Sequence, residues 1–193
     1  MKTNLKNVSL RILLIVNASI LTVPTFASSE IDTLTASCSA CHGADGVAPS
    51  SDWPSLAGQK QGYLLAQLKA FKSGHRTNVL MDNQLSNKSE ADLVKIAQHY
   101  ASLSFKKAES TSINKDGENV RASCLSCHGM IGKTVNETWP NLAGQNQGYL
   151  LKQLKDFSSK KRDSMIMNVI ASELTEQEMK DVAQYYEQIG SEY

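Results

Sequence analysis

The chain of 193 residues lacks a strong net charge, a disulfide framework and a long apolar run. Its 20 Lys and Arg side chains nearly balance 19 Asp and Glu, which leaves a net charge of +1 and excludes binding to nucleic acid or to anionic membranes by bulk charge. Four cysteines are too few for a disulfide-dense scaffold. A hydrophobic content of 41% with 20% charged residues is that of a globular protein, neither disordered nor collagen-like.

The amino terminus has the pattern of a secretion signal. Three cations precede the apolar run 12–23, and small residues ending at Ala27 suit a signal peptidase. This run is interrupted by Asn17 and Ser19 and is shorter than the roughly twenty residues that a membrane anchor, the alternative, needs. We therefore expect residues 1–27 to be a cleaved signal peptide and the mature protein to be periplasmic. Cleavage removes three cations and no anion, which changes the net charge from +1 to −2.

The mature chain contains an internal duplication, with two copies of one sequence unit. A displacement of 86 positions, without any gap, places Cys38–His42 on Cys124–His128. The same offset pairs Trp53-Pro54 with Trp139-Pro140, Leu56–Gln59 with Leu142–Gln145, Gln61–Leu65 with Gln147–Leu151, Arg76 with Arg162, and Met81 with Met167. Because one inserted residue would rotate the buried face of a helix, this repeat predicts two copies of one fold. We expect domains at 28–107 and 108–193, with the polar stretch Phe105–Asn114 as linker.

The apolar spacing within each copy predicts an all-α fold. Residues at i, i+3, i+4 and i+7 mark one helix in each copy: Leu93, Ile96, Ala97 and Tyr100, and then Met179, Val182, Ala183 and Tyr186. Capping boxes, Ser89-x-x-Asp92 and Thr175-x-x-Glu178, precede these helices. Another helix is expected near Gln61–Ser73, and no convincing strand pattern is found. A unit of about 80 residues has a small apolar core that supplies little net stability, so it usually needs an additional stabilising group inside it.

Each copy begins with Cys-x-x-Cys-His, the pattern of c-type haem attachment. Cysteines three apart share one face of a helical turn, so both can bond the vinyl groups of one haem while the next histidine lies under the iron. The predicted thioether cysteines are Cys38, Cys41, Cys124 and Cys127, and the predicted axial histidines are His42 and His128. A thioredoxin-like pair would need a βαβ context, and a zinc site would have to join cysteines 86 residues apart while ignoring both histidines. We therefore predict two covalent haem c groups, one in each domain.

The sixth iron ligand decides between electron transfer and ligand chemistry at an open iron. Met81 is the one methionine of the first mature half, and Met167 is its partner in the repeat. We predict these two as axial ligands, with Met165 as the competitor in the second half. His75 in a polar turn and His99 in a helix are the alternatives to Met81.

These features together resemble the dihaem cytochromes of the cytochrome c4 family. The resemblance rests on tandem Cys-x-x-Cys-His units, each followed by Pro-x-Leu-Ala-Gly-Gln, Tyr-Leu-x-x-Gln-Leu, an Arg five residues before a Met, and Ala-x-x-Tyr. It covers essentially the whole mature chain. It implies two class I cytochrome c domains that face each other with their haems close, and a carrier of electrons toward terminal oxidases without catalytic residues of its own.

The resemblance also implies roles for polar groups around the haems. Pro54 and Pro140 would each offer a carbonyl to the imidazole Nδ1–H of the axial histidine. The alternative is that Trp-Pro shapes a loop and packs its indole on the core, and the two roles are compatible. The paired polar groups expected at the haem propionates or at the domain interface are Gln59 and Gln145, Tyr63 and Tyr149, and Arg76 and Arg162.

One difference between the copies concerns the methionine loops. Met81 is followed by Asp82-Asn83-Gln84-Leu85, whereas Met167 is followed by the less polar Asn168-Val169-Ile170-Ala171. Because polarity near a haem edge shifts its potential, we predict unequal haems, with the lower potential in the first domain.

Two classes of function stay open at this point. The leading one is a carrier between redox proteins, from a membrane quinol-oxidising complex or other donor to a terminal oxidase or other acceptor. It has neither a nucleic-acid partner nor a small-molecule substrate, and loose membrane association is left open. The alternative is the dihaem subunit of an enzyme like flavocytochrome c sulfide dehydrogenase, which a co-purifying flavin subunit would reveal. A dihaem peroxidase or thiosulfate-oxidising enzyme would need an open or cysteine-ligated iron, and no cysteine is left over.

Overall fold

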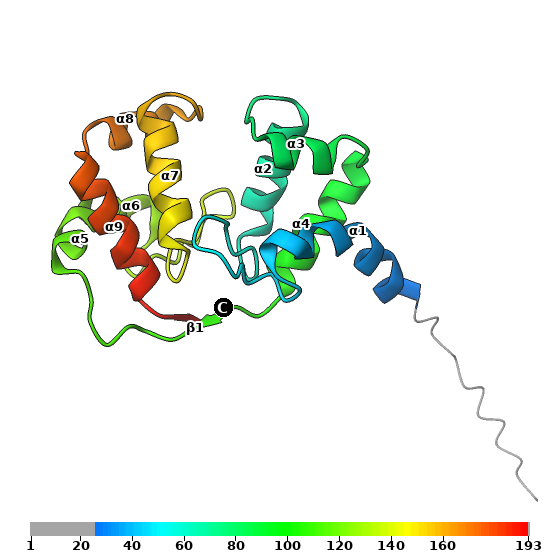
Figure 1. The fold of residues 1–193 in the computed structure, drawn as a ribbon, viewed down its shortest axis with the longest axis horizontal. Helices are drawn as coiled ribbons and strands as arrows, with labels where there is room; N and C mark the ends of the chain where they lie inside the picture. Colours follow the sequence, from blue (N-terminus) through cyan, green and yellow to red (C-terminus); the bar gives the residue numbers. More distant parts are fainter. Residues whose placement is uncertain (1–25, 193) are drawn as a thin grey trace, which may run out of the picture.

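The computed structural model describes residues 26–192 and consists of two helical halves side by side (Figure 1). Nearly all of the predicted signal peptide, residues 1–25, lies outside the described residues. Within the described part of the chain, no helix combines the length and the apolarity needed to cross a membrane.

The two halves contain matching helices, so the predicted all-α duplication is confirmed. The first half consists of α1 (Phe26–His42), α2 (Gln61–Lys72), α3 (Val79–Leu85) and α4 (Glu90–Ser102). The second consists of α5 (Lys115–Val120), the 3-10 turn η1 (Arg121–Ser123), α6 (Leu125–His128), α7 (Gln147–Ser158), α8 (Met165–Ser172) and α9 (Glu176–Gln188). The helix predicted to Ser73 ends one residue earlier, and Ser73 is its C-cap.

The two capping boxes form as predicted and start α4 and α9. The Ser89 hydroxyl accepts from the Asp92 backbone N–H at 3.1 Å, while the Asp92 carboxylate accepts from the Ser89 N–H at 2.8 Å. Thr175 and Glu178 make the same pair of bonds at 3.2 and 2.8 Å. Each such cap typically stabilises a helix by about 1 kcal/mol. The eight residues of the predicted apolar stripes on α4 and α9 are all buried.

A short strand pair, which the sequence analysis did not predict, ties the linker to the C-terminal segment. In β1 (Lys106–Lys107) and β2 (Ser191–Glu192), Lys106 pairs with Glu192 and Lys107 with Ser191 in antiparallel register. A two-residue strand is too short to leave an alternating pattern in the sequence. Phe105, at the start of the predicted linker, is only 2% exposed, so this end of the linker packs into the core.

The second half begins differently from the first because α5 crosses very close to α9. A Cβ on Gly117 would lie 2.1 Å from the Asp181 carbonyl oxygen, so only glycine fits at this crossing. Asn114 fixes the start of α5: its side-chain oxygen accepts from the Gly117 N–H at 2.9 Å and its amide donates to the Asp181 carboxylate at 3.0 Å. The first half instead runs through the equivalent region as the single helix α1.

Two candidate haem sites and the interface between the domains

Both motif histidines are the last residues of helices and are held by the same hydrogen bond. His42 ends α1 and His128 ends α6, and their exposed fractions are 8% and 7%. The Nδ1 atom of His42 lies 2.9 Å from the Pro54 carbonyl oxygen, and that of His128 lies 2.9 Å from the Pro140 carbonyl oxygen. Because a carbonyl oxygen only accepts, Nδ1 carries the proton in each ring, and the Nε2 lone pair is left to bind a metal.

The turn after each histidine requires glycine. Gly43 and Gly129 both have φ of +82°, and a Cβ on either would lie 2.2 or 2.0 Å from a backbone oxygen four residues later. This turn sends the chain back beneath the imidazole, where the Trp-Pro segment supplies the carbonyl.

Burial sets the protonation state of the motif residues. It lowers the pKa of His42 and His128, although the bonds to Pro54 and Pro140 partly oppose this, so both imidazoles are neutral at pH 7. Burial also raises the pKa of the first cysteine in each motif, whereas a redox-active thiol pair has a lowered one. Among the described residues, no three His, Cys, Asp or Glu side chains gather as a metal site, so the four cysteines form no zinc cluster.

The predicted methionine ligands lie in the first turns of the two short helices α3 and α8. The Asn78 side chain accepts from the Met81 N–H at 3.2 Å, and the Ser164 hydroxyl accepts from the Met167 N–H at 3.3 Å, so each methionine is the third residue of a capped helix. Both side chains line the cavity that contains the histidines. Met165 is 90% exposed and is not among the lining residues.

The two alternative histidines differ in position. His75 lines the edge of the cavity, and its Nδ1 is 2.7 Å from the Ser73 hydroxyl. His99 does not line the cavity and packs its ring edge-on against Tyr100, with 5.1 Å between ring centroids.

One continuous cavity of about 980 Å³ runs through both halves. The predicted haem residues all line it: Cys38, Cys41, His42, Pro54 and Met81 in the first half, and Cys124, Cys127, His128, Pro140 and Met167 in the second. The hydroxyl groups of Tyr100 and Tyr186 are buried beside it without a hydrogen-bond partner in the described part of the chain. A wide, mostly apolar cavity lined by the motif cysteines, the motif histidine and a methionine in each half fits a haem in each half.

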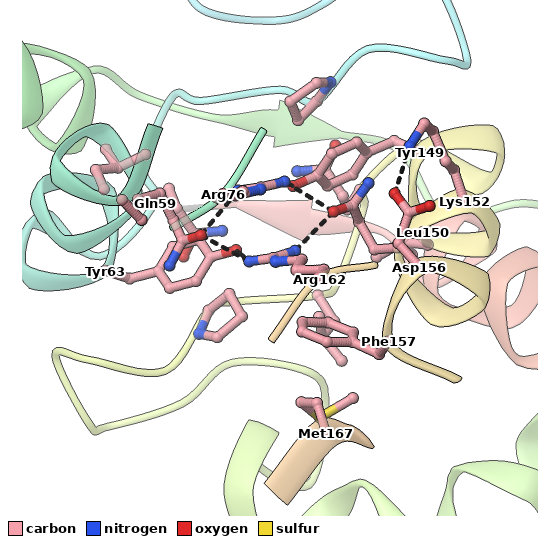
Figure 2. Close-up of a pocket in the computed structure, with 18 of the residues that line it drawn as sticks. Gln59, Tyr63, Arg76, Tyr149, Leu150, Lys152, Asp156, Phe157, Arg162 and Met167 are labelled. Atoms are coloured by element: carbon pink, nitrogen blue, oxygen red, sulfur yellow. Dashed lines mark hydrogen bonds and ion pairs between the residues drawn. The ribbon is translucent and has the colours of Figure 1, made fainter. Parts of the chain in front are cut away.

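Arg76, Gln67, Arg162 and Gln153 form a closed ring of hydrogen bonds across the interface, and Tyr149 and Tyr63 are each bonded to one of its arginines. The two arginines and the two tyrosines are labelled in Figure 2. Arg76 donates to Gln67 of its own domain at 2.8 Å and to Tyr149 and Gln153 of the other domain at 3.2 and 2.7 Å. Arg162 repeats this arrangement with Gln153 of its own domain at 2.7 Å and with Tyr63 and Gln67 of the other at 3.0 and 2.8 Å. Each guanidinium also stacks on a phenylalanine of its own domain, Arg76 on Phe71 and Arg162 on Phe157. The ring therefore joins the two domains symmetrically.

The ring brings two positive charges close together inside the protein. In the described part of the chain, neither Arg76 nor Arg162 forms an ion pair with a carboxylate. Burial alone would raise the pKa of Tyr149, but the charges of Arg76 and Arg162, together with hydrogen bonds from Arg76 and Tyr63, lower it to about 8. A buried cation without a carboxylate partner, such as Arg162, is costly, and the propionate groups of haem are anions of the kind that would neutralise it and the partly exposed Arg76. The ring shows that Arg76, Arg162, Tyr63 and Tyr149 are interface contacts, while their role as propionate partners stays a prediction.

Other interface residues were not singled out from the sequence. Gln67 and Gln153 match in the repeat, so the duplication alone could have marked them. Asn146 donates to the Ser50 and Trp53 carbonyl oxygens across the interface at 3.0 and 2.8 Å. Its counterpart in the repeat is Lys60, so no pairing in the sequence pointed to it.

An all-α chain with two Cys-x-x-Cys-His motifs, whose residues line one mostly apolar cavity together with a methionine from each half, has the features of the class of dihaem c-type cytochromes. The family model described as Cytochrome c matches residues 30–103 and 115–189. The chain is 34% identical over 163 residues to cytochrome c4 of Pseudomonas aeruginosa, covering 77% of this chain and 81% of that protein. The chain belongs to the cytochrome c4 family, and its cofactors are two haem c groups.

Two further comparisons agree with this assignment. The crystal structure of reduced recombinant cytochrome c4 from Pseudomonas stutzeri superposes with a TM-score of 0.77 at 30% identity, over 83% of this chain and 97% of that chain. A protein named thiosulfate dehydrogenase electron acceptor, from Thiomonas intermedia, is 31% identical over 167 residues, which are 78% of this chain and 77% of that protein. Electron transfer between proteins is therefore the general function.

Proposed function

We propose that the protein is a periplasmic electron carrier whose two irons are closed by His42 and Met81 and by His128 and Met167. The observation that carries this proposal is the cavity, because in each half an oriented neutral imidazole and a methionine line the same apolar space. A closed iron favours electron transfer over peroxide or small-ligand chemistry.

The chain's own residues prepare each site for a one-electron step with little rearrangement. Haem c supplies the iron that accepts and releases the electron. The carbonyl groups of Pro54 and Pro140 hold each imidazole in one orientation, and the capped first turns of α3 and α8 hold the backbone of each methionine that would bind the iron. Buried apolar side chains such as Leu64 and Leu150 exclude water from the cavity walls. Rigid ligands and a dry site keep both redox states in nearly the same geometry.

The ligand assignment is tested by mass and spectroscopy on the mature periplasmic protein. We expect a denatured mass with two haems and a start at Ser28, together with the weak long-wavelength band of thioether bound to ferric iron. Met81→Ala and Met167→Ala should each remove part of this band, whereas the matched control Met165→Ala should leave it intact. A mass without haem, or a full band in Met167→Ala, would contradict the proposal.

The partners we propose are a quinol-oxidising complex as donor and a terminal oxidase as acceptor. A second candidate is acceptance of electrons from a thiosulfate dehydrogenase, which is favoured by the name of the Thiomonas intermedia relative. Purification from the native periplasm would reveal a flavin subunit if the chain served a flavocytochrome-like enzyme instead. Stopped-flow reduction of the purified protein by quinol-oxidising membranes, compared with reduction by a thiosulfate dehydrogenase plus thiosulfate, separates the two candidates.

A further inference from the structure

Each axial histidine is hydrogen-bonded to a peptide group that is itself bonded to the opposite domain. The Pro54–Ser55 peptide accepts from His42 Nδ1 through its carbonyl oxygen at 2.9 Å. The N–H of the same peptide donates to Oε1 of Gln145, from the second domain, at 2.9 Å. A single peptide group therefore connects His42 to Gln145.

The second domain repeats this arrangement in the opposite direction. The Pro140–Asn141 peptide accepts from His128 Nδ1 at 2.9 Å, and its N–H donates to Oε1 of Gln59, from the first domain, at 2.8 Å. Each glutamine also returns a bond from its amide nitrogen, Gln145 to the Ser55 carbonyl oxygen at 2.9 Å and Gln59 to the Asn141 carbonyl oxygen at 3.0 Å. These paired bonds fix the orientation of both amides.

Burial prevents water from replacing these bonds. Ser55, Asn141, Gln59 and Gln145 are between 5% and 7% exposed. In such surroundings a bond to a peptide N–H polarises the peptide and makes its carbonyl oxygen a stronger acceptor. A stronger acceptor draws the Nδ1 proton further, which makes the imidazole a better electron donor to iron.

We infer that Gln145 and Gln59 are positioning residues that tune the haem of the opposite domain through the Pro54–Ser55 and Pro140–Asn141 peptides. The inference rests on the proposed function, because it requires His42 and His128 to bind iron. A more basic imidazole stabilises ferric iron and lowers the potential. Loss of either glutamine bond therefore raises the potential of the haem in the other domain.

The test is a redox titration of the full dihaem protein with Gln145→Met or Gln59→Met, each of which keeps the side-chain length and removes the amide. A Met81→His variant identifies which step belongs to the first haem. For Gln145→Met we expect about a threefold fall in the oxidised-to-reduced ratio of the first haem at fixed solution potential, or roughly 30 mV at 59 mV per tenfold change. The second haem should move less, and Gln59→Met should show the reverse pattern.

Asn146→Ala is the matched interface control. Asn146 bonds the carbonyl oxygens of Ser50 and Trp53 across the same interface but does not touch the Pro54–Ser55 peptide. If this control shifts the first haem as much as Gln145→Met does, or if each glutamine variant mainly shifts its own domain, the inference is wrong. If the methionine variants do not fold, Gln145→Asn and Gln59→Asn replace them, because they shorten the same amide side chains. Each should then mainly shift the potential of the haem in the opposite domain.

The thioether-to-iron band distinguishes a wrong ligand assignment from a wrong role for the glutamines. A wild-type protein without this band contradicts the proposed ligands themselves. A protein with the band intact and no crossed shift contradicts only the role of the glutamines.

Discussion

Replacing Arg162 with lysine tests how much the arginine ring stabilises the pairing of the domains. Arg162 is 8% exposed and makes three hydrogen bonds, two of them to residues of the first domain. Lysine keeps the charge but loses the planar fork, so at least two bonds are lost. At about 1.5 kcal/mol for each bond to a charged group, Arg162→Lys should destabilise the folded protein by about 3 kcal/mol.

Arg76→Lys is the matched comparison for this prediction. Arg76 makes three equivalent bonds but is partly exposed, so water can replace some of them. We expect Arg76→Lys to lower the free energy of unfolding about half as much as Arg162→Lys does. The measurement is urea unfolding of the haem-loaded protein, followed by circular dichroism. A double-mutant cycle with Tyr63→Phe should show coupling of about 1 kcal/mol to Arg162 across the interface. A loss below 1 kcal/mol for Arg162→Lys, or a larger loss for Arg76→Lys, would refute this account of the ring.

Three further predictions concern differences between the two copies. Lys160 has φ of +58° where the first domain has Gly74. Lys160→Gly should therefore raise the free energy of unfolding by about 1 kcal/mol, measured by urea titration, and no gain would count against backbone strain at this turn. Asp82 follows Met81 and accepts from the Asn78 N–H, so its negative charge should lower the potential of the first haem; redox titration should give two steps, and Asp82→Asn should raise the lower one. Gly117→Val should force α5 away from α9 and cost about 2 kcal/mol or more, measured as a lower Tm; an unchanged Tm would contradict the close crossing.

The sequence predicted those parts of the fold that depend on local or repeated signals. The capping boxes at Ser89 and Thr175 place helix starts because the bonding groups lie three residues apart. The gapless offset of 86 residues predicts duplication because helices do not tolerate insertions in their buried faces. The haem motifs act within a single helical turn, so spacing alone identified them.

The interface could not be predicted because its contacts join residues that are far apart in the chain. The bonds from Gln59 and Gln145 span 82 and 90 residues, and no periodic pattern reports such a separation. Paired polar residues in both copies suit a haem propionate and a domain contact equally well, so the repeat left that choice open for Arg76 and Arg162. Asn146 shows the opposite difficulty, because a contact present in only one copy leaves no trace in the repeat.

The duplication gives each domain a role in the electronic environment of the other. Without the other domain, the N–H of the peptide that holds each histidine would lose its glutamine partner and would need water in its place. In the pair, Gln145 and Gln59 take the place of that water with fixed amides. The arginine ring lies at the same interface, so a change in how the domains pack alters both the charge near the cavity and the bonds behind the histidines. A partner that shifts the domains on docking would therefore change both potentials together, whereas a partner that contacts only one methionine loop would change one.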